Sequence, residues 1–160
     1  MSIFKQFSEY DALNRMAKLC AKREYSRGEI KDKLSCLGVS TDKQEHIISK
    51  LISLNYINDE RYASMFIADK IKFNKWGPIK IEQGLLAKHV PESIYKPLLK
   101  EIDDGVFLNV LIPLLKKKYT TINAKNKYEK KQKLFRYGLS RGFNYNILNK
   151  AFSYLNFTDE

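Results

Sequence analysis

The segment Ile30-Lys31-Asp32-Lys33-Leu34-Ser35-Cys36-Leu37-Gly38-Val39 decides the fold, because it is the first copy of a pattern that recurs twice. An apolar residue is followed four positions later by a second apolar or small residue, and nine positions later by a third apolar residue. The pattern returns over 81–90 and 134–143, at offsets of 51 and 53 residues. Such self-similarity is typical of repeat proteins, in which each module packs on its neighbours. The sequence therefore predicts three tandem copies of one helical module.

Capping signals predict the helix boundaries of the first module. Ser26 and Glu29 form a capping box, in which the hydroxyl and the carboxylate each accept a hydrogen bond from a backbone N–H that the first helical turn leaves unpaired. Gly38 ends that helix, because glycine readily takes the left-handed conformation common after a helix. Thr41 and Gln44 predict a second capping box at the start of the next helix.

Apolar residues recur at helical spacing, and no stretch shows the alternation of a strand bounded by turns. The predicted fold is all-α, with three tandem three-helix, helix-turn-helix-like repeats over 10–55, 56–103 and 104–155 that form an elongated, curved array. In the first repeat the apolar stripes are Leu13, Met16, Ala17 and Cys20, then Ile30, Leu34 and Leu37, then Ile47, Ile48, Leu51 and Ile52.

Asparagine and proline residues predict helix boundaries in the later repeats. Asn58 caps a helix, and Gly77-Pro78 ends that helix and begins the next, since proline in the first turn loses no intrahelical hydrogen bond. Pro97 and Pro113 interrupt apolar helical patterns. We expect a kink or a shortened helix at each.

The composition is that of a folded soluble protein with a basic third part. Of the 160 residues, 44% are hydrophobic and 29% charged, and only 7 are Gly and 4 Pro. The net charge is +11, and residues 104–160, with 11 basic and 4 acidic residues, hold +7 of it. Such an asymmetric field favours a polyanionic partner, because binding to phosphates releases condensed counterions. The sign of the charge does not distinguish DNA, RNA and an acidic protein.

Neither export, nor a membrane, nor a metal is indicated. Residues 1–7 lack a sustained apolar region, and no later stretch is apolar for long enough to span a bilayer, so we expect a cytoplasmic protein. Cys20 and Cys36 have only His46 and His89 as further soft ligands. We therefore expect reduced, partly buried thiols and no zinc site.

The basic series in the last third is the first candidate binding site. Ten cations lie between residues 116 and 141, with Glu129 as the only acidic residue among them. Tyr119, Tyr128 and Tyr137 are interleaved and suit stacking on bases, although packing in or beside the core is the simpler interpretation of each. The series also fits a solvated face of a lysine-rich protein. Its members are Lys116, Lys117, Lys118, Lys125, Lys127, Lys130, Lys131, Lys133, Arg136 and Arg141.

The second candidate site surrounds the Gly77-Pro78 turn. Trp76 is the only tryptophan, and such a residue anchors packing between repeats more often than it contacts a partner. The set consists of Lys70, Lys72, Lys75, Trp76 and Lys80.

No catalytic residue is predicted. The adjacent carboxylates of Asp59-Glu60 and of Asp103-Asp104 invite an acid–base or metal interpretation, but first-turn residues that complement a helix dipole explain them better. The sequence has no phosphate-binding loop, no G-x-S-x-G and no H-E-x-x-H. We expect neither enzyme activity nor a cofactor.

Several motifs, in order and spacing, resemble the RecX family of regulators of the RecA recombinase. The resemblance covers roughly residues 10–152. It is carried by Ala12-Leu13, Ser26-x-x-Glu29-Ile30, Lys33-Leu34, the run Leu54-Asn55-Tyr56-Ile57-Asn58-Asp59-Glu60-Arg61-Tyr62-Ala63, Gly77-Pro78-x-x-Ile81, Lys133-Leu134-Phe135-Arg136-Tyr137 and Arg141-Gly142-Phe143-x-Tyr145-x-Ile147.

The resemblance implies a curved array of three-helix repeats that binds in the groove of the RecA–single-stranded-DNA filament. There the family limits filament growth, ATP hydrolysis and strand exchange. The chain departs from the family in two places: His89 stands where glycine is usual, so that helix is expected to end without a left-handed glycine, and Lys80 stands where arginine is common.

Three functions remain open. The first is modulation of a RecA filament, with single-stranded and also double-stranded DNA as partners. The second is independent, helix-turn-helix-like binding to nucleic acid. The third is a helical-repeat adaptor for an acidic protein. In each case we expect a monomer that does not associate with membranes.

Overall fold

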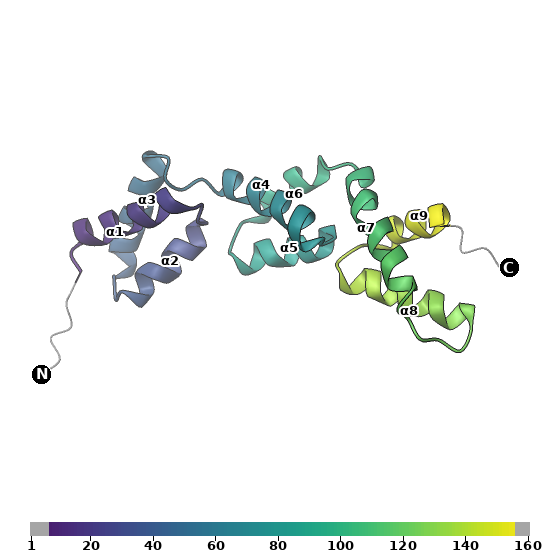
Figure 1. Ribbon diagram of the computed structural model, residues 1–160. Helices are drawn as coiled ribbons and strands as arrows, with labels where there is room; N and C mark the ends of the chain where they lie inside the picture. The colour runs from purple at the N-terminus through teal and green to yellow at the C-terminus, as the bar shows by residue number, and fades with distance from the viewer. Residues whose placement is uncertain (1–6, 156–160) are drawn as a thin grey trace, which may run out of the picture. The chain divides into compact units, whose positions relative to one another are not determined.

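The structure, a computed structural model, describes residues 7–155. Residues 1–6, on which the expectation about export partly rests, and residues 156–160 lie outside this range. Every element assigned within it is helical (Figure 1). No helix there is long and apolar enough to cross a membrane. The elements are α1 (Glu9–Lys22), α2 (Arg27–Cys36), α3 (Thr41–Ser53), α4 (Asp59–Asp69), the π-helix η1 (Lys70–Asn74), α5 (Pro78–Ala87), α6 (Glu92–Lys100), α7 (Asp104–Tyr119), α8 (Lys127–Ser140) and α9 (Tyr145–Leu155).

The chain folds into two compact units. Among the described residues, unit 1 combines those up to 64 with 85–95, and unit 2 combines 65–84 with those from 96 onward. Helices α4, α5 and α6 therefore each begin in one unit and end in the other. The boundaries predicted for three repeats follow sequence similarity and not compactness, and they stay a prediction.

Each copy of the recurring sequence pattern forms the same type of helix end. After α2, α5 and α8 the chain takes the left-handed conformation at Gly38, His89 and Gly142, with φ of 74°, 58° and 91°. The next backbone N–H then bonds back to a carbonyl five residues earlier, which satisfies acceptors that the helix end leaves free. These bonds run from Val39 N to Leu34 O (3.1 Å), from Val90 N to Leu85 O (3.1 Å) and from Phe143 N to Gly138 O (3.2 Å).

The end of α5 keeps this geometry without glycine. His89 adopts the left-handed conformation although its Cβ makes that conformation costly, by about 1–2 kcal/mol. The change from glycine to histidine therefore does not alter how the helix ends. Local packing around His89 maintains a conformation that its own residue type disfavours.

The first capping box predicted from the sequence is confirmed, and the second is wrong. Ser26 Oγ accepts from Glu29 N (3.1 Å), and the Glu29 carboxylate accepts from Ser26 N (3.4 Å). Helix α3 is preceded by Ser40, which makes no side-chain cap, and Thr41 is already helical. The Gln44 side chain is buried and instead donates to Val39 O (2.7 Å), because a buried amide needs a partner.

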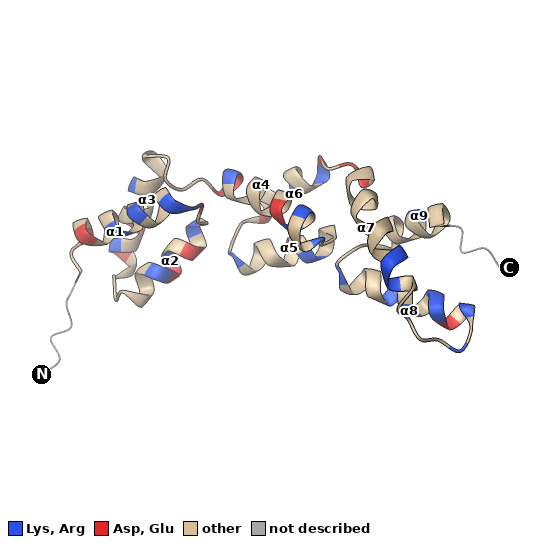
Figure 2. Ribbon diagram, in the orientation of Figure 1, with Lys and Arg blue, Asp and Glu red and all other residues tan. Residues whose placement is uncertain are grey.

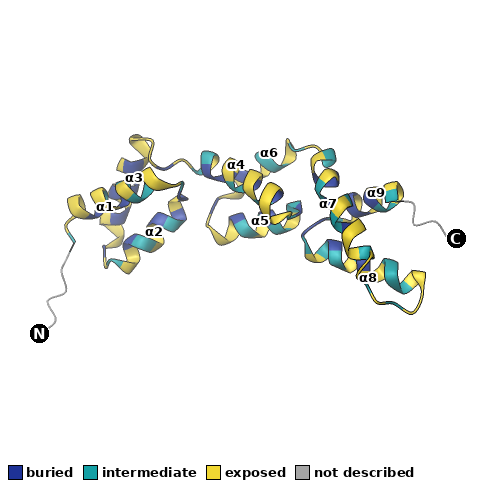
Figure 3. Ribbon diagram, viewed as in Figure 1, coloured by how far each residue is buried: buried dark blue, intermediate teal, exposed yellow. Residues whose placement is uncertain are grey.

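Buried hydrophobic residues of α1, α2, α3 and the segments that follow these helices form a core in unit 1. Helix by helix, buried positions alternate with exposed ones at helical spacing, as Figure 3 shows. Four residues of the predicted stripes, Leu13, Ala17, Cys20 and Leu37, are only partly buried, and Ile52 is exposed. Cys36 is also exposed, so the expectation of a partly buried Cys36 thiol was wrong. The core residues are Ala12, Met16, Tyr25, Ile30, Leu34, Val39, Ile47, Ile48, Leu51 and Ile57.

In unit 1, the start of α2 packs on the end of α5. The Ser26 hydroxyl, which is fully buried, donates to Lys88 O (2.8 Å). A Cβ added to Gly28 would lie 2.4 Å from the Cβ of His89, so this contact requires glycine on α2. Asp59, at the start of α4, accepts from Arg27 N (2.8 Å) and so supplies a further acceptor to the first turn of α2.

In unit 2, the start of α5 packs on the end of α8 in the corresponding way. Gly77 N donates to Arg141 O (2.8 Å), and Ile79 N donates to Gly142 O (2.9 Å). A Cβ added to Gly77 would lie 2.4 Å from backbone atoms of Gly142 and Phe143. Each unit thus contains one junction between the start of one recurring helix and the end of the next.

Neither internal proline ends its helix. Pro97 lies inside the nine-residue α6, which agrees with the expected shortening, but Pro113 lies inside α7, a helix of 16 residues. Helix α7 is therefore not shortened at Pro113, and the other expected outcome there, a kink, stays a prediction. Buried Phe107, Leu111 and Leu115 bind α7 to unit 2 on both sides of the proline, and this packing outweighs the lost hydrogen bond.

Candidate nucleic-acid interface

Helices α7 and α8 form a hairpin that carries most of the first basic series. Leu115 and Leu134 are fully buried, and the connection between the helices returns the chain so that the end of α7 and the start of α8 lie side by side (Figures 1 and 2). Asn126 caps α8 by accepting from Glu129 N (2.8 Å). The resulting basic hairpin consists of Lys116, Lys117, Lys118, Lys125, Lys127, Lys130, Lys131 and Lys133.

Two tyrosines position lysines at this hairpin. The Lys130 ammonium lies 4.0 Å from the ring centroid of Tyr119, and the Lys118 ammonium lies 5.0 Å from that of Tyr137. Both rings are partly buried, so for Tyr119 and Tyr137 packing beside the core is the observed role. Tyr128 differs, because 71% of its surface is exposed.

Glu129 is held as an anion inside the cationic set. A backbone hydrogen bond from Lys125 N (3.0 Å), followed in importance by the Lys133 ammonium, lowers the pKa of this carboxyl below its usual value. Lys133 Nζ lies 3.4 Å from the carboxylate and also donates to Asn123 O (2.7 Å). Glu129 therefore neutralises little of the hairpin beyond Lys133.

The structure separates Arg141 from the hairpin and joins it to the second candidate set. Its guanidinium donates to the carbonyls of Asn74 and Lys75, directly before the Gly77-Pro78 turn. Arg141 thus anchors the turn to the end of α8. Arg136 stays exposed on α8.

The second candidate set follows η1, a π-helical turn that the sequence did not predict. Lys75 closes η1 in the left-handed conformation, with φ of 55°, and so ends the helix ahead of the Gly77-Pro78 turn. Lys72 lies 5.2 Å from the ring centroid of Phe73, and 69% of the Phe73 surface is exposed. A π-helical segment of this kind is frequent at functional sites.

The Trp76 ring packs against Phe66, and two lysine ammonium groups lie close to it. Its ring meets Phe66 edge to face, with centroids 6.5 Å apart. The ammonium groups of Lys70 and Lys80 lie 4.8 Å and 5.1 Å from its centroid. Phe66 and the small Gly84, over which both rings pack, were not identified from the sequence. The signal was an isolated glycine within a helix, which often marks a close approach.

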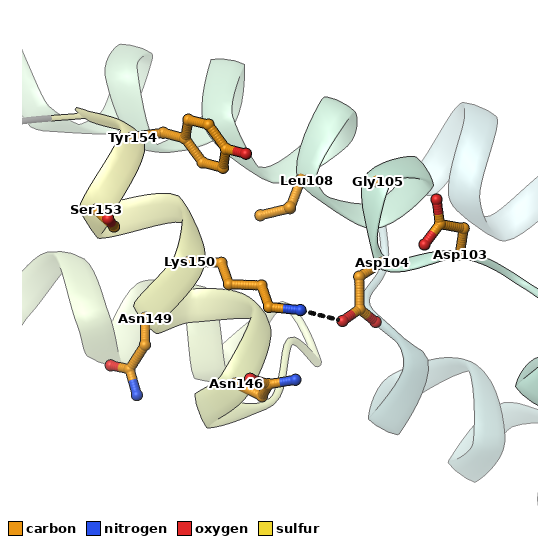
Figure 4. Close-up of a pocket in the computed structure, with 9 residues that line it drawn as sticks. All are labelled: Asp103, Asp104, Gly105, Leu108, Asn146, Asn149, Lys150, Ser153 and Tyr154. Atoms are coloured by element: carbon orange, nitrogen blue, oxygen red, sulfur yellow. Dashed lines mark hydrogen bonds and ion pairs between the residues drawn. The ribbon is translucent and has the colours of Figure 1, made fainter.

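Two of the four carboxylates singled out in the sequence, Asp59 and Asp104, make structural contacts. Asp104 lies in an open groove between the start of α7 and α9, of about 630 Å³, where its carboxylate pairs with Lys150 Nζ (2.7 Å; Figure 4). The hydrogen bond to Asp104 raises the pKa of Lys150. Asn58 accepts from Arg61 N (3.0 Å) and confirms the predicted cap of α4. Within residues 7–155 no three potential metal ligands gather.

The fold and the two basic clusters define a protein of tandem three-helix domains that presents cations at helix ends. Profiles of the second and the third three-helix domain of RecX match residues 58–96 and 108–152. The chain belongs to the RecX family of regulatory proteins.

Relatives agree with this assignment. The regulatory protein RecX of Haemophilus ducreyi is 32% identical over 147 residues, which cover 92% of this chain and 91% of that protein. RecX of Clostridium perfringens is 37% identical over 123 residues, and there the match spans 57% of the relative's length. The crystal structure of RecX from Lactobacillus salivarius superposes with a TM-score of 0.84 at 25% identity, covering 94% of this chain and 97% of that one.

Proposed function

We propose that this protein acts in the cytoplasm as a regulator of the RecA recombinase, by binding along the RecA–single-stranded-DNA filament and restraining it. Bound there, it lowers ATP hydrolysis, filament extension and strand exchange. Membership of the RecX family supports a regulatory role. The observation that carries the proposal is the basic hairpin of α7 and α8.

The hairpin suits a filament because the filament is a polyanion. Eight lysines are presented by two adjoining helix ends and their connection, with Glu129 as the only acid between them. Such a patch accelerates association with DNA and contributes affinity that falls with salt. The predicted array of repeats extends the contact along the filament groove, and the equivalent junctions in the two units support a repeating mode of packing.

The first test is a titration of the single-strand-stimulated ATPase of RecA from the same cell. We expect inhibition at concentrations well below that of RecA, because a groove-bound regulator acts on a cooperative polymer. An unchanged ATPase rate with excess protein would exclude a filament regulator.

The hairpin is tested by the triple variant Lys130→Glu, Lys131→Glu and Lys133→Glu. It changes the local charge by six and raises the concentration needed for inhibition by about tenfold or more, since a phosphate that the protein does not neutralise keeps its condensed counterions. The matched control, Lys18→Glu, Lys22→Glu and Lys31→Glu, makes the same charge change at exposed positions of unit 1. Circular dichroism checks that both remain helical. Equal inhibition by the two triple variants would remove the hairpin from the mechanism.

An alternative function is binding to nucleic acid without RecA. The short helices and tight turns of the three-helix domains favour this candidate. It predicts sequence-selective binding to duplex DNA that persists at moderate salt. Purely nonspecific binding with a steep salt dependence would count against it.

A further inference from the structure

Two ammonium groups are held at the ring of one tryptophan in unit 2. Lys70 reaches Trp76 from the start of η1, and Lys80 reaches it from the first turns of α5. Lys70 also lies 5.2 Å from the ring centroid of Phe66. The contacts described for both ammonium groups are with aromatic rings, which orient a cation without neutralising it.

The ring that orients these cations is itself fixed. Phe66 lies edge to face with Trp76, and a Cβ at Gly84 would meet both rings, 2.8 Å from Phe66 and 3.3 Å from Trp76. On the other side of the turn, Arg141 holds the carbonyls of Asn74 and Lys75, and Gly77 N donates to Arg141 O. The site is thus built by residues of α4, η1 and α5 together with Trp76 and Arg141, and is not a chance group of mobile lysines.

The arrangement favours phosphate over a base as the ligand at Trp76. Base stacking requires a free ring face, whereas the ammonium groups at 4.8 Å and 5.1 Å already occupy the space beside the indole. Both ammonium groups lie about 5 Å from one ring centroid, so the two flexible lysine side chains can converge on an anion with several acceptor oxygens. Phe73 differs from Trp76, because only one ammonium group, that of Lys72, is described at its ring and 69% of its surface is exposed, which leaves room for a base to stack.

We propose that Lys70 and Lys80 form a binding site for a backbone phosphate of single-stranded nucleic acid, with Trp76 as the residue that positions them and Phe73 as the side chain on which an adjoining base stacks. The proposal deepens the proposed function, since it assigns a direct contact to the single strand within the filament. It does not require the recombinase.

The test uses the full chain and a short oligothymidylate, without RecA. Trp76 is the only tryptophan, so its fluorescence reports on this site alone. A phosphate that draws the ammonium groups toward itself changes the surroundings of the indole, and we expect a saturable change in emission. Saturable binding seen by another method, with no change in Trp76 emission, would overturn the proposal.

Charge and stacking are separated by variants. Lys70→Gln with Lys80→Gln is expected to weaken binding about tenfold at low salt and to reduce the slope of log affinity against log salt by about 1.4, near 0.7 for each single-strand phosphate contact. The matched control, Lys18→Gln with Lys22→Gln, removes the same charge from exposed positions of unit 1 and leaves the slope unchanged. Phe73→Ala weakens binding without changing the slope. Equal slopes for the two double variants would overturn the phosphate assignment.

Trp76 needs a readout that a purely structural role would not move. Trp76→Phe keeps a ring but weakens the cation contact, since indole binds cations better than benzene does. It is expected to reduce affinity about threefold with the salt slope kept, because both lysines remain, and urea titration checks that the variant is fully folded under the assay conditions. Inorganic phosphate and duplex DNA serve as competitors. Displacement of the oligonucleotide by millimolar phosphate as readily as by single strands would indicate a general anion site and overturn the assignment to a nucleic-acid backbone.

The test and the proposed function can fail separately. If the oligonucleotide binds as described but the RecA ATPase is unaffected, the phosphate site stands and the regulatory proposal falls. If the ATPase is inhibited and the variant with Lys70→Gln and Lys80→Gln binds single strands like the control, the regulatory proposal stands and the phosphate site falls.

Discussion

The junction in unit 1 and the junction in unit 2 solve one packing problem with different residues. In both, the start of one helix rests on the end of another that closes with a left-handed residue. In unit 1 a side chain, Ser26, donates to the helix end, and that end carries His89. In unit 2 the backbone itself donates, from Gly77 to Arg141, and the end carries Gly142.

The difference teaches where each junction tolerates change. The close approach in unit 1 is between Gly28 and a side-chain atom of His89, so removal of that side chain relieves it. The close approach in unit 2 is between Gly77 and the backbone around Gly142, and no substitution removes a backbone. The unit 2 junction also carries Trp76 and Arg141, so the more rigid junction is the one beside the proposed phosphate site.

The largest effect is expected for Gly77→Ala. The added Cβ lies 2.4 Å from the carbonyl group of Gly142, and moving that backbone breaks the bonds from Gly77 N and Ile79 N. We expect a loss of about 3 kcal/mol in the free energy of unfolding, from urea titration followed by Trp76 fluorescence. Gly105→Ala is the control, because its nearest neighbour is a flexible carboxylate oxygen at 3.3 Å. Equal losses of stability for Gly77→Ala and Gly105→Ala would show that the chain at Gly77 is not in tight contact with the backbone around Gly142.

A smaller effect is expected for Gly28→Ala, and a second substitution, His89→Gly, is expected to relieve it. Its Cβ meets the Cβ of His89, which costs about 2 kcal/mol. Combining it with His89→Gly removes the opposing atom, and we expect a coupling of at least about 1 kcal/mol in a double-mutant cycle measured by circular dichroism in urea. Additive losses would contradict a direct clash, and the junctions would then not differ as described.

The smallest effect is expected for Ser26→Ala. The hydroxyl accepts from Glu29 N and donates to Lys88 O, so its removal leaves two backbone groups unpaired. The expected loss is about 1–2 kcal/mol, measured by urea titration. Ser26→Gly is the comparison, because glycine stands at the equivalent cap of α5. If glycine restores full stability, the hydroxyl adds nothing to the junction.

Local signals in the sequence identified the elements well. The box of Ser26 and Glu29, the cap at Asn58 and the left-handed glycine at 38 are confirmed. They depend on residues a few positions apart, so the sequence contains all that their geometry needs. The box at Thr41 failed because Ser40 precedes α3 and a buried carbonyl, Val39 O, competes for the Gln44 side chain.

The sequence predicted which residues belong to the candidate sites but not how these residues lie relative to one another. Fifteen residues were proposed from charge and spacing, and their roles in binding stay a prediction. No local signal indicated that Arg141 belongs with Asn74 and Lys75, which lie 67 and 66 positions earlier in the chain. Nor did it indicate that Tyr119 and Tyr137 hold lysines across a hairpin.

By itself, the sequence determined an all-helical chain with one helix end repeated three times, a charge gathered in its last third, and membership of the RecX family. Only the tertiary structure decided which helix start meets which helix end, that His89 is held left-handed, and which lysines lie at Trp76. The physical reason is the distance along the chain over which each kind of interaction acts. Caps and periodicity act within one or two turns of chain, whereas junctions and cation–ring contacts join residues whose proximity depends on the packing of the whole unit.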